Sequence, residues 1–331
     1  MANRVVVETG ARLHFALLDL TGDLGRIDGS IGVALTRPRL VLRACPGRSL
    51  KTNMFPDLAH LALQRLNKHY GLHKGLEIEV LESYPHHVGL GLTTQMLLST
   101  AAAYNALYGC NATVRELARI VGRGGTSGVG VAAFEHGGFI FDGGHTFGPG
   151  KQKQGFLPSD RSAAPPPPVL FRSPLPRDWI FDVFVPQSSA GLSGRPELEF
   201  FRKNCPIQGR DTCKIAHIVL SCILPAVAER DVETFVKGIN LLTTLGFKRK
   251  EINRQSKFVK RLIRCFAQAV GGSAAVGMSS FGPAIFVIGR LKSRRLYFST
   301  LTRLAAAEGT AAALVHYEAR CRNKGATVTI L

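Results

Sequence analysis

The stretch "LEIEVLESYPHHVGLGLTTQMLLSTAAAYNAL", residues 76–107, combines three local patterns that together decide the fold class. Its first residues alternate apolar Leu76, Ile78 and Val80 with glutamates, as a strand with one buried face requires. From Thr94 onwards the residues are mostly apolar or small, which is compatible with a buried helix that ends before Gly109. The unit therefore reads as a strand, a glycine loop and a helix.

The glycine loop between this strand and this helix is suited to an anionic ligand. Glycines let backbone N–H groups approach phosphate oxygens, and the N-terminus of a helix adds partial positive charge. The segment 89–95 matches neither the P-loop nor the dinucleotide pattern. A second cluster, "GRGGTSG" at 122–128, also precedes a predicted helix. Two such loops leave a phosphate site and a purely structural role as alternatives of about equal weight.

The rest of the chain indicates two parts. Residues 4–44 are rich in strand-forming residues, and helices are predicted over 57–70, from a capping box at Thr113 and Glu116, and over 126–136. The segment 148–178 holds eight of the 17 prolines and has no periodic pattern, which is typical of an interdomain connection. Helices alternate with short strands beyond it. We therefore expect an α+β protein with domains at 1–160 and 161–331.

Composition limits the possible classes of function. The chain has 331 residues, of which 45% are apolar, enough for an enzyme-sized core. Its 42 Lys and Arg against 23 Asp and Glu give a formal net charge of +19, which favours an anionic partner or a strongly positive surface. The basic residues are scattered along the chain, so nucleic acid is not expected as a partner.

Cysteines and the N-terminus favour a cytoplasmic protein. The seven cysteines form no C-x-x-C pair and no zinc-ligand spacing, so they are expected to be reduced thiols. The start "MANRVVVETG" lacks a secretory pattern, and no uninterrupted apolar stretch has the length of a membrane span.

Three segments, "GLGLTTQ", "SGVGVAAFEHGG" and "GMSSFGPAIFVI", resemble the sequence landmarks of the GHMP kinase superfamily. That resemblance implies an S5-like N-terminal domain and a ferredoxin-like C-terminal domain. Further segments are similar to the β-ribofuranosylaminobenzene 5′-phosphate synthase family, and the similarity runs from about residue 4 to the C-terminus. These segments are "ARLHFALLDLTGDLGRIDGSIGVAL", "GRGGTSGVGVAAFEHGGFIFDGGH", "GLSG", "LGFKRKEINRQ" and "NKGA".

The family resemblance implies a pentosyltransferase of methanopterin biosynthesis. Its members condense phosphoribosyl pyrophosphate with 4-aminobenzoate and release CO2 and pyrophosphate. They need a divalent cation such as Mg2+ and no organic cofactor, and we expect a homodimer. An ATP-dependent small-molecule kinase is one alternative, and a non-catalytic relative that binds anions or nucleic acid is another. Superfamily kinases often read S-G-x-D here, but this chain has Gly130 in the place of the acid, and glycine cannot accept a proton.

Departure of pyrophosphate from ribose requires hydrogen-bond donors for the leaving group and carboxylates for the cationic sugar. The predicted substrate-binding residues are Arg12, His14, Arg26, Gly89, Gly91, Thr93, Thr94, Gln95, Arg123, Gly125, Thr126, Ser127 and Gly128. The predicted catalytic residues are Asp19, Asp28, Glu135 and His136. Arg26 and Asp28 are the best polar pair for binding substrate and metal, and the individual metal ligands are left open.

Each of these candidates also has a structural alternative. Asp19 and Asp28 can stabilise turns, and His14 can be a hydrogen-bonded core histidine. Glu135 can face solvent while His136 ends its helix, and Asp142 lies in a "DGG" turn sequence.

The first glycine loop departs from the family pattern at two positions. Relatives usually carry G-L-G-S-G-T-Q, whereas this chain has Leu92 and Thr93 in the fourth and fifth places. If the backbone at Thr93 had to adopt a positive φ, the side chain would hinder the approach of a ligand.

Overall fold

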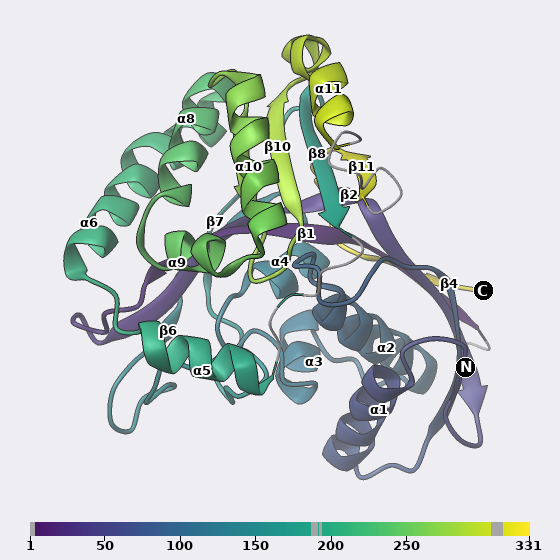
Figure 1. Cartoon of the computed structure of the whole chain (residues 1–331). Coiled ribbons are helices and arrows are strands. Elements are labelled where there is room, and N and C mark those ends of the chain that lie inside the picture. The colour runs from purple at the N-terminus through teal and green to yellow at the C-terminus, as the bar shows by residue number, and fades with distance from the viewer. Residues whose placement is uncertain (1–3, 187–190, 192–193, 306–313) are drawn as a thin grey trace.

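A computed structural model describes residues 4–186, 191, 194–305 and 314–331 and shows two sheets with helices (Figure 1). The larger sheet has the order β12-β1-β2-β4-β3, with β5 and β6 paired to β2, and β7 paired to β5. Its strands are β1 (Val5–Asp19), β2 (Arg26–Gly47), β3 (Lys51–Thr52), β4 (Gly75–Glu82), β5 (Phe139–Asp142), β6 (His145–Thr146), β7 (Val169–Ser173) and β12 (Thr327–Ile330).

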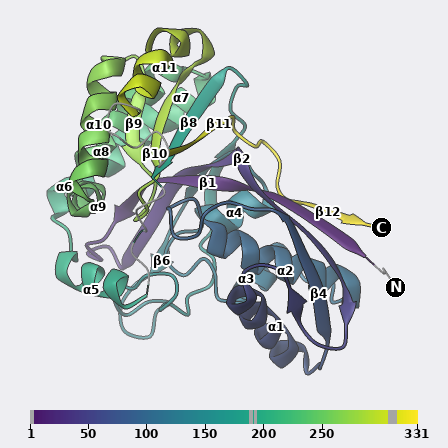
Figure 2. The same ribbon diagram turned by 45° about the vertical axis from the view of Figure 1, so that its right-hand side comes forward.

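Four helices belong to the same part of the chain, and they form where the sequence predicts them. They are α1 (Pro56–Tyr70), α2 (Leu92–Tyr108), α3 (Val114–Ile120) and α4 (Val129–Glu135). The capping box of α3 is confirmed, because the side chains of Thr113 and Glu116 each accept a hydrogen bond from the other residue's backbone N–H. In Figures 1 and 2, α1, α2 and α3 lie on one side of the long strands β1 and β2.

The second, four-stranded sheet has the order β11-β8-β10-β9 and lies on the other side of the long strands (Figure 2). Its strands are β8 (Trp179–Pro186), β9 (Ala275–Met278), β10 (Ile285–Arg290) and β11 (Leu314–Ala319). The accompanying helices are α5 (Arg195–Asn204), α6 (Gly209–Ile218), the π-helical turn η1 (Val219–Ile223), α7 (Leu224–Glu229), α8 (Val232–Thr243), α9 (Gly246–Arg254), α10 (Lys257–Val270) and α11 (Leu291–Ala305). The predicted α+β class is confirmed.

One continuous apolar core joins the two sheets. Phe235 of α8 packs edge-on against Phe15 of β1, with ring centroids 6.1 Å apart, and its ring lies tilted against that of Trp179 of β8, with centroids 4.9 Å apart. Both β7 and β12, from beyond residue 160, pair with strands of the larger sheet. The division into domains at 1–160 and 161–331 stays a prediction.

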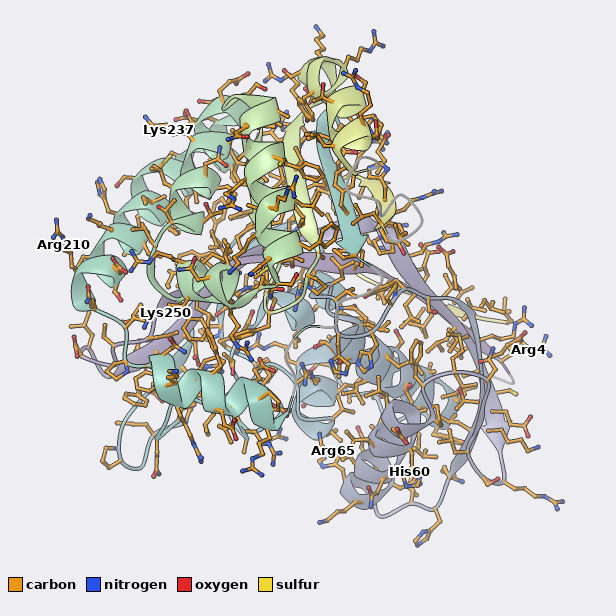
Figure 3. All side chains as sticks on the ribbon, in the orientation of Figure 1. Arg4, His60, Arg65, Arg210, Lys237 and Lys250 are labelled. Carbon is orange, nitrogen blue, oxygen red and sulfur yellow. The ribbon has the colours of Figure 1, made fainter. Side chains whose placement is uncertain are left out.

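Basic side chains occur on several different elements of the molecule. Figure 3 labels Arg4, Arg210 and Lys237 at widely separated places on the periphery of the molecule. One helical stretch, Gly209–Glu229, is long and apolar enough by length and composition to cross a membrane, which by itself is weak support for a span. The predicted homodimer and cytoplasmic location stay predictions.

Candidate active site

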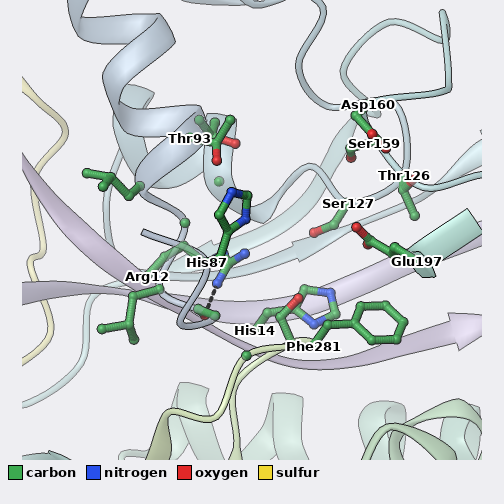
Figure 4. Close-up of a pocket in the computed structure, with 18 of the residues that line it drawn as sticks. Arg12, His14, His87, Thr93, Thr126, Ser127, Ser159, Asp160, Glu197 and Phe281 are labelled. Atoms are coloured by element: carbon green, nitrogen blue, oxygen red, sulfur yellow. Dashed lines mark hydrogen bonds between the residues drawn. The ribbon is translucent and has the colours of Figure 1, made fainter. Parts of the chain in front are cut away.

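A cavity of about 350 Å³ lies where β1, the glycine loop before α2, the start of α4 and the turn before β10 meet (Figure 4). The structure brings many of the predicted binding residues to it: Arg12, His14, Gly89, Gly91, Thr93, Thr94, Arg123, Thr126 and Ser127. The other predicted residues do not line it: Asp19, Arg26, Asp28, Gln95, Gly125, Gly128, Glu135 and His136. The two glycine clusters therefore meet in space at one concave site.

The glycine loop turns sharply into α2 at two glycines. Gly89 and Gly91 have φ values of 89° and 86°, which residues other than glycine rarely adopt. A Cβ atom at Gly89 would also lie 2.1 Å from the carbonyl oxygen of Ser279. Thr93 lies in the first turn of α2 and is not among the described residues with positive φ, so the hindrance considered from the sequence does not arise.

Two half-buried arginines flank this loop. Arg12 donates to the carbonyl oxygen of Gly89 and, at 3.5 Å, to Oγ of Ser279, and Arg123 donates to Oγ1 of Thr94 at 3.0 Å. Burial lowers the pKa of Arg12 to about 10, and it also lowers the pKa of Arg123. A guanidinium with a pKa near 10 keeps its charge at neutral pH, so the loop carries fixed positive charge next to the cavity.

His14 presents an unsatisfied imidazole to the same cavity. Its side chain is buried, and neither ring nitrogen has a hydrogen-bond partner among the described residues. Burial, followed by the charges of Lys248 and Arg12, lowers its pKa well below the usual value, so the ring is neutral. The pairing of β1 with β2 is irregular on both sides of Arg12–His14, which fits β-bulges that aim these side chains at the cavity. The alternative of a hydrogen-bonded core histidine is therefore not supported.

Three carboxyl groups that the sequence did not single out also line the cavity: Asp160, Glu197 and Glu251. Burial, followed by the nearby charge of Asp160, raises the pKa of Glu197 to about 8. Glu251 forms a buried ion pair with Lys248. Glu197 follows the segment "GLSG", of which Leu192 and Ser193 lie outside the described residues, and Glu251 lies within "LGFKRKEINRQ". Both segments belong to the family resemblance, so these motifs could have pointed to the two acids.

Asp28 and Asp19 lie away from the cavity and have structural partners. Oδ2 of Asp28 is 2.6 Å from Nδ1 of His145 and 2.9 Å from Nζ of Lys153, and all three side chains are buried. Oδ1 of Asp19 accepts hydrogen bonds from the backbone N–H and the hydroxyl of Thr21, both at 2.7 Å. These contacts agree with the structural alternatives for the two acids.

Further predicted residues stabilise the scaffold around the cavity. The exposed Arg26 donates to the carbonyl oxygens of Gly143 and Gly144. Gln95 is fully buried, where it accepts from Thr9 and donates to the carbonyl oxygen of Gly130 at 2.9 Å. These contacts tie β1, α2 and α4 together and leave no free polar group on Gln95 facing the cavity.

Glu135 and His136 end α4 on its far side from the glycine clusters. His136 is half-exposed and its Nε2 lies 3.3 Å from Oε2 of Glu135. The geometry gives Glu135 and His136 no contact with the cavity.

Gly125 allows the loop before β7 to approach closely. A Cβ atom at Gly125 would lie 2.8 Å from Oγ of Ser162.

Asp142 is connected to the cavity although it does not line it. Its fully buried carboxylate accepts hydrogen bonds from Ser30 and from the N–H groups of Gly128 and Gly144, at 2.9 and 3.0 Å for the two N–H groups. Oγ of Ser30 lies 2.7 Å from Oγ of Ser127, which lines the cavity. Burial raises the pKa of Asp142 to about 6.

Gly130 stands where superfamily kinases often carry an acid, and the space beside it is tight. A Cβ atom there would lie 3.2 Å from Cγ2 of Thr94, at the contact between the first turns of α2 and α4.

Within the described part of the chain, no group of three or more His, Cys, Asp or Glu side chains is placed to hold a metal ion.

The comparisons with known proteins agree with the motifs. The family "GHMP kinases N terminal domain" matches residues 57–138. The chain is 38% identical over 299 residues to a β-ribofuranosylphenol 5′-phosphate synthase of Methanothermobacter thermautotrophicus, covering 87% of this chain and 89% of the relative. It is also 38% identical over 302 residues to the same-named protein of Archaeoglobus fulgidus, covering 88% and 92%.

Solved structures share the fold at low sequence identity. A homoserine kinase from Cytophaga hutchinsonii matches 99% of this chain and 98% of its own with a TM-score of 0.65 and 14% identity. A mevalonate diphosphate decarboxylase from Enterococcus faecalis matches 100% of both chains with a TM-score of 0.65 and 13% identity. These likenesses confirm the predicted GHMP kinase fold, and the closer relatives do not favour the kinase alternative. The chain belongs to the β-ribofuranosylphenol 5′-phosphate synthase family, a class of pentosyltransferases.

Proposed function

We propose that the chain joins C1 of phosphoribosyl pyrophosphate to the ring carbon that bears the carboxylate of a 4-substituted benzoate, with release of pyrophosphate and CO2. The names of the relatives specify a phenol product, which favours 4-hydroxybenzoate as the acceptor over the 4-aminobenzoate suggested by the sequence motifs. The observation that carries the proposal is a single cavity lined both by the glycine loop with Arg12 and Arg123 and by the aromatic rings of Phe201 and Phe281.

The donor fits the end of the cavity formed by the glycine loop. Arg12 and Arg123 supply positive charge there, and the first turn of α2 supplies backbone N–H groups. Charge builds on the pyrophosphate oxygens as the bond to ribose C1 breaks, so these fixed donors stabilise the transition state more than the ground state.

The aromatic acceptor fits the opposite end. Phe201 and Phe281 both line the cavity, with ring centroids 5.9 Å apart, and Leu17 adds a further apolar surface. In the view of Figure 4, Arg12 and Thr93 lie on one side of the pocket, whereas Phe281 and Ser127 lie on the other. Flat aromatic ligands pack well against such rings.

Two carboxyl groups suit the cationic sugar and a magnesium ion. Glu197 and Asp160 both line the cavity, and Mg2+ in proteins is commonly bound by one or two carboxylates together with substrate phosphates. We propose these two residues as its ligands, because the nearby charge of Asp160 helps to raise the pKa of Glu197. Bound Mg2+ would neutralise charge on the departing pyrophosphate.

The test incubates the purified protein with Mg2+, phosphoribosyl pyrophosphate and either 4-hydroxybenzoate or 4-aminobenzoate, while CO2 and pyrophosphate are measured. We expect equimolar release of both products, faster with 4-hydroxybenzoate, and loss of turnover on chelation with EDTA. A parallel reaction with ATP in place of the ribose donor serves as the control. Absence of CO2 release with both acceptors would exclude the proposed reaction.

A further inference from the structure

A chain of hydrogen bonds leads from a buried carboxylate to the cavity wall. Asp142 of β5 lies directly opposite Ser30 of β2 in the antiparallel pair, and the hydroxyl of Ser30 donates to Oδ2 of Asp142. On its other side, Oγ of Ser30 is 2.7 Å from Oγ of Ser127. Asp142 and Ser30 are both fully buried, whereas Ser127 lines the cavity.

We propose that Ser127, Ser30 and Asp142 form a proton relay, which removes the hydroxyl proton of a phenolic acceptor as its ring attacks ribose C1 and returns it when CO2 leaves. This inference rests on the proposed function and deepens it. It gives Ser127 the contact with the substrate and makes Ser30 and Asp142 act through it.

The polarity of the chain can reverse without movement of heavy atoms. When Asp142 is ionised, Ser30 donates to it and Ser127 donates to Ser30, so Oγ of Ser127 presents a lone pair to the cavity. When a proton enters at Ser127, each hydroxyl passes its own proton on, and the Asp142 carboxyl becomes the donor to Ser30. The N–H groups of Gly128 and Gly144 hold the carboxyl group in place in both states.

The proton and electron balance of the reaction calls for such a relay. Loss of the phenol proton sends an electron pair to the ring carbon that bears the carboxylate. That carbon bonds to C1 as the bond from C1 to pyrophosphate breaks, which leaves a dienone carboxylate. Cleavage of the bond to CO2 then returns the electron pair to the ring and oxygen, and the oxygen takes back its proton. The relay is therefore restored in each turnover, and no other co-reactant is needed.

An amine acceptor has no comparable need for a base. The lone pair of an aniline nitrogen is available for donation into the ring before any N–H proton is lost. A phenol donates far more strongly after it is deprotonated. The relay thus predicts a difference between the two acceptors that a purely structural role of the same residues does not.

The surroundings of Asp142 suit the exchange of a proton. Its direct partners are the neutral hydroxyl of Ser30 and two backbone N–H groups, and no cation bonds to it among the described residues. The charged neighbour on β2 is Asp28, which is hydrogen-bonded to His145 and forms an ion pair with Lys153. Burial, opposed by the hydrogen bonds and assisted by Asp28, raises the pKa of Asp142 to about 6, a value that suits a general base near neutral pH.

The experiment compares turnover of 4-hydroxybenzoate and 4-aminobenzoate by the wild-type protein and by Ser127→Ala and Asp142→Asn. We expect both variants to lose about 10²-fold in kcat with 4-hydroxybenzoate and less than about threefold with 4-aminobenzoate. Ser127→Thr, which restores a hydroxyl, should recover most of the lost rate. Ser99→Ala is the matched control, because Ser99 is a buried serine of α2 whose hydroxyl has no partner among the described residues.

Ser127→Ala keeps the test decisive if Asp142→Asn fails to fold, because it removes only one hydroxyl at the cavity wall. Equal losses with the two acceptors, or no loss in Ser127→Ala, would overturn the relay while the proposed function stands. Turnover of 4-aminobenzoate alone by the wild-type protein would also overturn it. Inactivity of the wild-type protein with both acceptors would instead overturn the proposed function, and the relay with it.

Discussion

Asp28 and Asp142 are two buried carboxylates that lie near each other in the same sheet, yet their surroundings differ. Asp28 of β2 contacts His145 and Lys153, so its negative charge is matched by a buried ammonium group. Asp142 of β5 contacts a serine hydroxyl and two backbone N–H groups. The charge of Asp28 is thus paired with a cation, whereas Asp142 has only neutral donors in a dry site, where burial raises its pKa to about 6.

The two carboxylates also differ in what lies beyond their partners. Nζ of Lys153 reaches on to the carbonyl oxygen of Leu157 at 3.1 Å, so the contacts of Asp28 fasten the segment after β6 to β2. Ser30, the partner of Asp142, also contacts Ser127, and Ser127 lines the cavity. Burial alone therefore does not indicate whether an acid is structural or functional, because the partners and their connection to the cavity decide it.

The largest effect should come from breaking the ion pair of Asp28. Asp28→Ala leaves the ammonium group of Lys153 buried without its partner, so we expect a loss of about 3–5 kcal/mol in the free energy of unfolding, measured by urea denaturation. Glu79→Ala is the control, because Glu79 pairs with Arg43 at the surface and its loss should cost less than about 1 kcal/mol. Similar costs for the two variants would contradict the structural role of Asp28.

Removal of the cation beside the glycine loop should affect the reaction more than the fold. Arg12→Met should lower kcat/KM for phosphoribosyl pyrophosphate by about 10²–10³-fold, since a preorganised donor to the leaving group is lost. Steady-state kinetics with a fixed acceptor concentration would measure this loss. Arg210→Ala, at an exposed position of α6, removes the same formal charge from the surface and should leave the rate unchanged.

The titration of Asp142 should appear in the pH dependence of the reaction. As a base it must be ionised, so kcat with 4-hydroxybenzoate should rise as the pH increases through about 6 and level off above it. Asp142→Asn should remove this limb as well as lower the plateau. An acid limb of unchanged midpoint in the variant would show that another group controls the profile.

The smallest effect should come from His136. Its side chain is half-exposed at the end of α4 and contacts Glu135, outside the cavity. His136→Ala should change the free energy of unfolding by less than about 0.5 kcal/mol and turnover by less than about twofold. A loss comparable to that of Ser127→Ala would restore the role that the sequence suggested for His136.

The sequence by itself determined the local elements and the family. Alternation in 76–82, the glycines before α2 and the capping box at Thr113 each act over a few residues, so the strand, the turn and the helix start are readable from adjacent positions. The ordered motifs likewise identified the family, because they persist as contiguous segments.

Only the tertiary structure decided which acids serve the cavity. Glu197 reaches it from α5, and Asp142 connects to it through Ser30, 112 positions away in the chain. The ion pair between Asp28 and Lys153 likewise joins residues 125 positions apart in the chain. Such contacts depend on which strands pair and in what register, and a one-residue change of register turns every side chain to the opposite face. No local pattern around an aspartate records such contacts, so the sequence alone could not tell which buried acid is connected to the cavity.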